Sequence, residues 1–155
     1  MKRNNINKNT LELCDVKHID LYIGINDFNI ENVLFLELVK NKIIDGSFSN
    51  IVFSDSCVII NGLYIKLNSS DFSKHNVVKT LIYIEEKVIE LYTQTFDCSE
   101  KKPIYVVKDY FQDTENLRYF FNKIITSHIF KLSGVWESRT SFGINHKFIK
   151  TIGFI

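Results

Sequence analysis

Two strand-like runs decide the fold of this chain, and they read Phe130-Lys131-Leu132-Ser133-Gly134-Val135-Trp136-Glu137 and Phe142-Gly143-Ile144-Asn145-His146-Lys147-Phe148-Ile149-Lys150. A short polar break, Ser138-Arg139-Thr140-Ser141, separates them. Two runs rich in β-branched and aromatic residues, joined by a few polar residues, are typical of a β-hairpin. We therefore expect a long hairpin within residues 123–155.

The same segment is basic, whereas most of the chain is acidic. Residues 123–155 hold five basic side chains and one acidic side chain, a balance of +4. Residues 1–10 carry +3, so residues 11–122 must carry −6 to give the total of +1. A basic, aromatic hairpin on an acidic body indicates a surface for a polyanion. An ordinary solvated sheet face is the alternative explanation of this charge.

The length and composition predict one domain. A chain of 155 residues is expected to form a single core, here from residues 11–155, and 45% hydrophobic residues is normal for a globular protein. Residues 1–10 are basic without an apolar run, so we expect a flexible basic arm and no secretory signal. Charges interrupt every apolar stretch before the roughly 20 residues of a membrane helix. We expect no membrane partner.

The cysteines give no sign of a disulfide framework or a metal site. Cys14, Cys57 and Cys98 are odd in number and far apart. We therefore expect free thiols in a reducing, intracellular compartment. Cys14 and His18 would share one face of a helix, but no further pair completes the four ligands of a zinc site. We expect no metal.

Three segments before residue 70 favour strands. Ile19–Ile25 alternates apolar and other residues, as a strand does. Asn61-Gly62 lies between two apolar runs, and this pair is the strongest short-range signal for a tight hairpin turn. Leu63, Ile65 and Leu67 would then share one face, with Tyr64 and Lys66 on the other. Asn29–Asp45 fits either a helix or a strand, and we favour the strand.

The middle of the chain predicts helices. Apolar residues recur with helical spacing from Val77 to Tyr92, which indicates an amphipathic helix over roughly Ser73–Thr95. Ser73 or Asn76 is the expected N-cap. After the only proline, Pro103, we expect a short strand or turn and then a helix near Glu115–Asn122.

Motifs of catalysis are missing from the sequence. It contains no nucleophile elbow, P-loop or dinucleotide-binding glycine pattern. His146 shares a strand face with the apolar Ile144 and Phe148, and the sequence shows no partner that it would need as a general base. We therefore expect a structural role. The acidic residues Asp109, Asp113 and Glu115 do not have the spacing of a glycine-containing cation-binding loop. We expect them to form a solvated face. We expect neither an enzyme nor a cofactor.

The order of elements predicts an α+β fold. Several strands, one long helix, an irregular segment and two final strands can be laid onto an OB-fold, a five-stranded barrel that commonly has a helix between its third and fourth strands. We therefore expect an OB-like antiparallel barrel or sheet, with one long amphipathic helix between strands and a C-terminal β-hairpin.

The hairpin also resembles a known group of proteins. Ser133-Gly134-Val135-Trp136-Glu137 and Phe142-Gly143-Ile144 look like the terminal hairpin of proteins encoded by nucleocytoplasmic large DNA viruses, and the runs 48–54 and 60–65 add to the likeness. Some of these proteins are similar to T7-like single-stranded-DNA-binding proteins. The resemblance implies an OB-fold and a non-catalytic role in viral DNA replication or processing, in the host cytoplasm or nucleus.

Two functional hypotheses follow. The first is binding of single-stranded DNA or RNA, which needs a cationic groove and aromatic platforms. The candidate residues are Lys131, Arg139, Lys147, Lys150, Tyr64, Lys66 and Trp136. Strand alternation places Trp136 on the face of Phe130 and Leu132, so for this residue a core position is favoured over stacking. The second hypothesis is a structural or assembly protein, a virion component or a subunit of a homo-oligomer or larger complex, that binds no nucleic acid.

Overall fold

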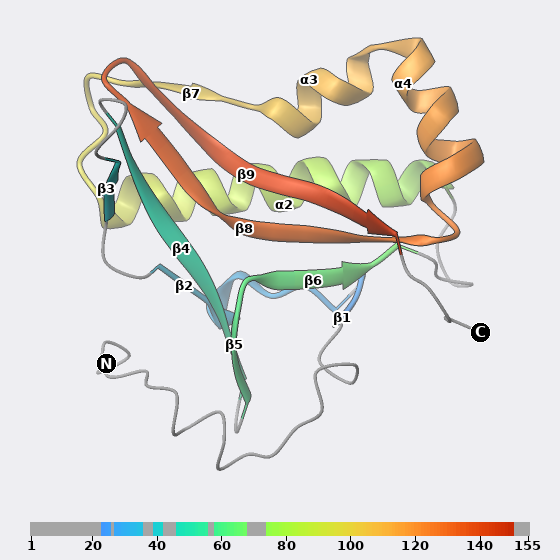
Figure 1. Ribbon diagram of the computed structural model, residues 1–155, viewed down its shortest axis with the longest axis horizontal. Helices are drawn as coiled ribbons and strands as arrows, with labels where there is room; N and C mark the ends of the chain where they lie inside the picture. Colours follow the sequence, from blue (N-terminus) through green and yellow to red (C-terminus); the bar gives the residue numbers. More distant parts are fainter. Residues whose placement is uncertain are drawn as a thin grey trace.

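The computed structural model describes residues 23–25, 27–35, 39–41, 46–55, 58–67 and 74–150 (Figure 1). The elements are β1 (Ile23–Gly24), a 3₁₀ turn η3 (Ile30–Asn32), β2 (Val33–Phe35), β3 (Val39–Asn41), β4 (Gly46–Asp55), β5 (Val58–Asn61), β6 (Leu63–Lys66), α2 (Lys74–Thr95), β7 (Lys102–Ile104), α3 (Val106–Gln112), α4 (Thr114–Tyr119), a π-helical turn η4 (Phe120–Ile124), β8 (His128–Ser138) and β9 (Ser141–Lys150). The basic arm 1–10, Cys14, His18 and Cys57 lie outside the described residues.

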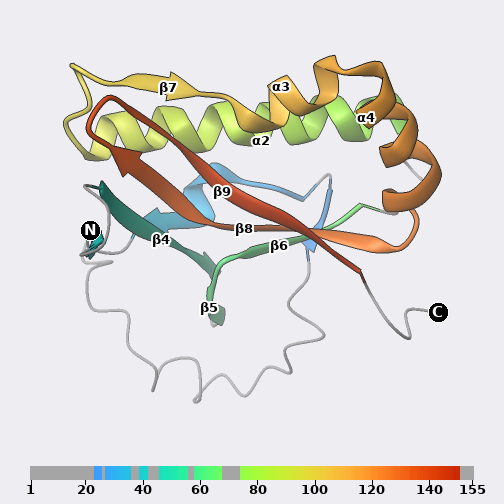
Figure 2. The same cartoon turned by 45° about the horizontal axis from the view of Figure 1, so that its top comes forward.

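The strands form one connected mixed sheet, so the fold is α+β. β8 pairs with β9 along one edge; along its other edge it pairs first with β6 and then with β4. β4 in turn pairs with β3, β2 and β5. The pairs β1–β6 and β7–β9 are parallel and the others are antiparallel, so the expected antiparallel sheet is wrong for these two short edge strands. α2 lies across one face of this sheet. The segment that contains β7, α3 and α4 runs beside α2 (Figure 2).

The C-terminal hairpin is confirmed. β8 and β9 pair in register from His128 opposite Lys150 to Glu137 opposite Phe142, with Arg139-Thr140 as the connection. The Ser138 hydroxyl oxygen accepts a hydrogen bond from the backbone N–H of Ser141 at 3.1 Å, which closes the turn. The structure adds one feature that alternation does not predict: the register shifts between Leu132 and Gly134, so Ser133 is a β-bulge.

The long helix is also confirmed, as α2. Its apolar stripe packs into the core, where residues such as Leu81, Ile84 and Val88 have no exposed surface. Asn76 lies inside the helix and is therefore not the N-cap, and Ser73 lies outside the described residues. Burial of such a stripe stabilises a helix far more than its intrinsic propensity does. The apolar periodicity of the sequence therefore predicted this helix correctly.

The turn expected at Asn61-Gly62 is wrong. Ile60 pairs with Phe53 of β4, whereas Leu63 pairs with Leu132 of β8, so β5 and β6 do not pair with each other. The hairpin of this region joins β4 to β5 instead. Gly62 does adopt a positive φ of 87°, but it uses this freedom to bend the chain from one partner strand to the next.

Within Asn29–Asp45 the described residues confirm the favoured strand as β2 and β3, and residues 36–38 and 42–45 lie outside the described ones. Asn29 caps only the short turn η3, where its side chain accepts the N–H of Glu31 at 3.0 Å. After Pro103 the expected strand is β7, and the helix near residues 115–122 is α4 with η4. α3 was not expected from the sequence.

A buried carboxylate explains how α3 is held. Glu85 of α2 has no exposed surface, and it accepts the backbone N–H groups of Val107 at 2.8 Å and of Lys108 at 3.0 Å. Burial raises the pKa of Glu85 although both hydrogen bonds favour its ionised form. The start of α3 is thus fixed to the middle of α2 by a long-range contact with no local sequence signal.

Two further findings concern expected absences. Cys98 is buried and free; Cys14 and Cys57 are not among the described residues. In the part of the chain that the structure describes, no helix is both long enough and apolar enough to span a membrane.

Candidate nucleic-acid interface

The sheet has two faces of different character. The inner face packs against α2; for example, the Phe142 ring stacks on Tyr92 at 5.6 Å. The other face, here called the outer face, carries the alternate residues of β4, β6, β8 and β9. On β8 the bulge at Ser133 changes the alternation, because two residues there oppose one residue on β9. Lys131 pairs with Lys147 before the bulge, and Trp136 pairs with Gly143 after it.

The bulge at Ser133 puts Trp136 on the opposite face from the one expected. Strict alternation put Trp136 on the face of Phe130 and Leu132, but one extra residue moves it to the face of Lys131. Trp136 is half-buried and does not belong to the hydrophobic core cluster, whereas Phe130 and Leu132 are central to that cluster. The expected core position of Trp136 is therefore wrong, and its ring lies on the outer face.

Three of the candidate residues form a row across neighbouring strands. Tyr64 of β6 pairs with Lys131 of β8, which pairs with Lys147 of β9. The Lys131 ammonium lies over the Tyr64 ring, 5.2 Å from its centre, a cation–π contact. Like charges that face each other across strands repel, so an anion placed between Lys131 and Lys147 would relieve that repulsion.

The aromatic part of the outer face rests on glycines. Trp136 lies over Gly143, where a built Cβ atom would be 3.0 Å from the indole ring. Phe48 of β4 pairs with Trp136 and lies over Gly134, where a Cβ atom would be 2.6 Å from the phenyl ring. Both aromatic rings are half-buried. The two glycines therefore allow flat rings to lie close to the sheet.

The remaining candidates lie around this centre. Lys66 is exposed two residues along β6 from Tyr64, on the same face. Arg139 is exposed at the tip of the hairpin. Lys150 pairs with His128 at the far end of β9. It is two positions from Phe148, so strand alternation places it on the inner face with Phe148. The structure therefore groups the lysines and aromatic residues of β6, β8 and β9 but does not add Lys150 to them.

Sequence reasoning missed one neighbour of the row, Phe48, whereas strand alternation already placed the other, Asn145, on the face of Lys147. Phe48 was not a candidate, because its strand partner on β8 depends on the register of β4. Asn145 is exposed opposite Gly134, and its amide can hydrogen-bond a base or a phosphate. The one available signal for the approach of Phe48 was Gly134 inside a strand-like run, since a glycine within a strand often marks a bulge or a close approach.

His146 occupies the inner face. It stacks on Phe130 at 5.4 Å and lies edge-on to Phe148 at 5.7 Å. Burial lowers the pKa of His146 below its ordinary value of 6.5, which favours the neutral ring. This surrounding agrees with the structural role expected for His146.

A second polar cluster lies at the other end of the hairpin. Glu137 accepts hydrogen bonds from the Tyr92 hydroxyl at 2.6 Å, from the Lys101 ammonium and from the Cys98 thiol at 3.8 Å. Burial opposes ionisation of Glu137, but the hydrogen bonds from Lys101 and Tyr92 outweigh it and lower its pKa. Burial raises the pKa of Tyr92 and brings that of Cys98 to about 11, so neither is a ready nucleophile. This cluster joins β8 to α2.

Glu137→Gln is expected to lower the free energy of unfolding by about 2 kcal/mol at pH 7, because one side of a largely buried ion pair is lost. The pKa of Glu137 is lower in the folded state, so its contribution is present above the ordinary value of 4.5 and is lost as the pH falls through the folded pKa. Urea unfolding at pH 7 and near pH 3 should show the difference shrinking. Glu90→Gln, in an exposed pair with Lys87, is the control; an equal effect would contradict this account.

Among the described residues no group of three or more His, Cys, Asp or Glu side chains is close enough to hold an ion. Comparisons with protein families, with curated proteins and with solved structures found no match to this chain.

Proposed function

We propose that this protein binds single-stranded nucleic acid, without catalysis, through the outer face of its sheet. One observation carries the proposal: Trp136 lies on the same face as Lys131 and Lys147 because of the bulge at Ser133. Single-strand binders combine cations for the phosphates with aromatic rings on which bases stack. Tyr64 and Phe48 provide two further rings on this face.

The arrangement separates the two kinds of contact. Lys131 and Lys147 lie side by side near the middle of the hairpin, and Trp136 lies five positions along β8, roughly 13–16 Å away. One extended strand of nucleic acid can then place phosphates at the lysines and a base on the indole. The excess of positive charge in residues 123–155 would attract the strand, while the acidic remainder favours binding on this side.

Two finer proposals accompany the first. We propose an OB-like character for the sheet, supported by β4, which pairs with β8 through residues 46–50 and with β2 and β5 through residues 51–55. An experimental structure with an open sheet would rule this out. A role in viral DNA replication or processing inside the host cell is proposed from the resemblance of the hairpin residues alone.

Salt dependence tests the main proposal. Replacing both Lys131 and Lys147 with Ala should reduce the slope of log affinity against log salt by about 1.4, since each phosphate neutralised on a single strand releases about 0.7 counterion. The measurement is fluorescence polarisation of labelled oligo-dT over a series of salt concentrations. The double variant Lys79→Ala and Lys87→Ala removes the same charge from α2 and should keep the wild-type slope. Equal slopes in all three proteins, or no binding at low salt, would reject the proposal.

A second candidate function is that of an assembly protein. The observation that favours it is a groove along α2, on the opposite side of the sheet from the lysine row. The two functions are separable, because no residue of the outer face lines that groove.

A further inference from the structure

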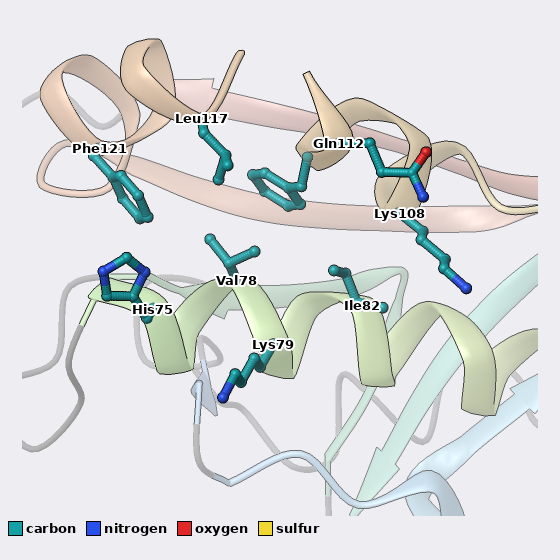
Figure 3. Close-up of a pocket in the computed structure, with 9 residues that line it drawn as sticks. His75, Val78, Lys79, Ile82, Lys108, Gln112, Leu117 and Phe121 are labelled. Carbon is teal, nitrogen blue, oxygen red and sulfur yellow. The ribbon is translucent and has the colours of Figure 1, made fainter. Parts of the chain in front are cut away.

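A groove runs between α2 and the segment β7–η4. Figure 3 shows its apolar part, where Val78 of α2 points toward Leu117 and Phe121 across the gap. This part has a volume of about 310 Å³. Its apolar lining consists of Val78, Ile82, Phe111, Leu117 and Phe121. Ile82, Leu117 and Phe121 are only half-buried, so the groove offers apolar surface to a partner.

The groove continues past this apolar part. A second part of about 480 Å³ lies between Glu86, Glu90 and Thr93 of α2 and Pro103 with Tyr105 on the other wall. Lys108 lines both parts, so the two parts adjoin at this residue.

The length of this groove decides between kinds of occupant. On α2 the lining residues recur every three or four positions from His75 to Thr93 and therefore form a single stripe. Eighteen residues at about 1.5 Å each give roughly 27 Å. This length suits a partner helix of about five turns and exceeds what one small ligand would fill.

The two parts of the groove differ in charge. The charged residues that line the apolar part are Lys79 and Lys108, and no acid lines it among the described residues. Neither lysine has an ion-pair partner in the described part of the chain. The second part carries Glu86 and Glu90 together with Lys108. Glu90 pairs with Lys87 at 3.4 Å, so Glu86 is the acid of this part that has no ion pair among the described residues. The complementary occupant has an acidic residue beside its apolar anchors and basic residues about two turns away.

Two contacts hold the walls of the groove together. Glu85 ties the backbone N–H groups of Val107 and Lys108 to α2 at the point where the two parts meet. His75 contacts Phe121 edge-to-face at 5.3 Å, which closes the apolar end. A preformed groove lowers the entropy cost of binding.

We propose that this groove binds an amphipathic helix of a partner protein, with apolar anchors one turn apart, an acidic residue beside them and basic residues at the other end. Apolar grooves between helices recognise such segments through anchors at positions i, i+3 or i+4. The inference is independent of nucleic-acid binding, since the groove and the outer face share no residue.

The test is selection from a phage-displayed library of helical peptides on the full-length protein, with counter-selection on the Ile82→Glu variant. Enriched peptides should carry paired apolar anchors, an adjacent acid and basic residues about two turns away. Ile82→Glu should weaken the best peptide at least tenfold, because it puts a charge among the anchors. Lys147→Glu, on the outer face, should leave its affinity unchanged.

A charge-reversal variant makes the test directional. In Lys79→Glu with Lys108→Glu, selection should prefer a basic residue where the wild type prefers an acidic one. Failure to enrich any peptide that depends on Ile82, or enrichment without the charge preference, would overturn the proposal. Binding of dodecanoate in the groove without any peptide would overturn it too, and would assign a small amphipathic carboxylate instead.

Discussion

Trp136→Ala is expected to weaken binding of oligo-dT by about tenfold to a hundredfold while the protein stays folded. Stacking of one base on an aromatic ring contributes about 1–3 kcal/mol, and each 1.4 kcal/mol is a factor of ten in affinity. The fold should tolerate the change because Trp136 lies outside the core cluster, on the face away from α2. Fluorescence polarisation gives the affinity, and thermal unfolding followed by circular dichroism gives the stability.

A neighbouring aromatic residue supplies the matched control. Phe142 pairs with Glu137 beside Trp136, but its ring is buried on the inner face. Phe142→Leu should lower the free energy of unfolding by more than about 1 kcal/mol and leave the affinity for oligo-dT unchanged below the melting temperature. Trp136→Phe keeps a ring and should retain most of the binding. If Trp136→Ala instead destabilised the protein as Phe142→Leu does, with no loss of binding, Trp136 would be structural.

Gly134→Ala is expected to lower the free energy of unfolding by about 3 kcal/mol, the largest effect on stability predicted for this protein. A Cβ atom at this position would overlap the carbonyl oxygen of Ser49 and lie 2.6 Å from the Phe48 ring. Because Gly134 pairs with Asn50 of β4, the clash would push β4 and β8 apart. Steric overpacking of this kind typically costs about 1–3 kcal/mol, and here backbone atoms must also move.

The control for this variant is the cross-strand neighbour of Gly134. Asn145 is exposed, and Asn145→Ala should change the stability by no more than about 0.5 kcal/mol. Urea unfolding of both variants gives the comparison. If Gly134→Ala were as stable as the wild type, the close approach of Phe48 to the hairpin would be incorrect.

The sequence predicted which residue types form the candidate site better than it predicted how they are arranged. The basic excess and the aromatic content of residues 123–155 pointed to the hairpin, and Tyr64, Lys131 and Lys147 lie in one row across neighbouring strands. The register that brings Tyr64 beside Lys131 joins positions 67 residues apart, so no local pattern contains it. Phe48 was missed for the same reason.

The elements with a local sequence pattern could be predicted from the amino-acid sequence. The stripe of α2 repeats every three or four residues, and the alternation of β8 and β9 repeats every two, so each is readable within a short window. The positive φ at Gly62 was also foreseeable from an Asn-Gly pair. The strand toward which Gly62 turns and the face that Trp136 occupies became known only from the three-dimensional pairing of the strands. The reason is that both depend on pairing with distant strands, where a bulge of one residue exchanges the two faces of the sheet.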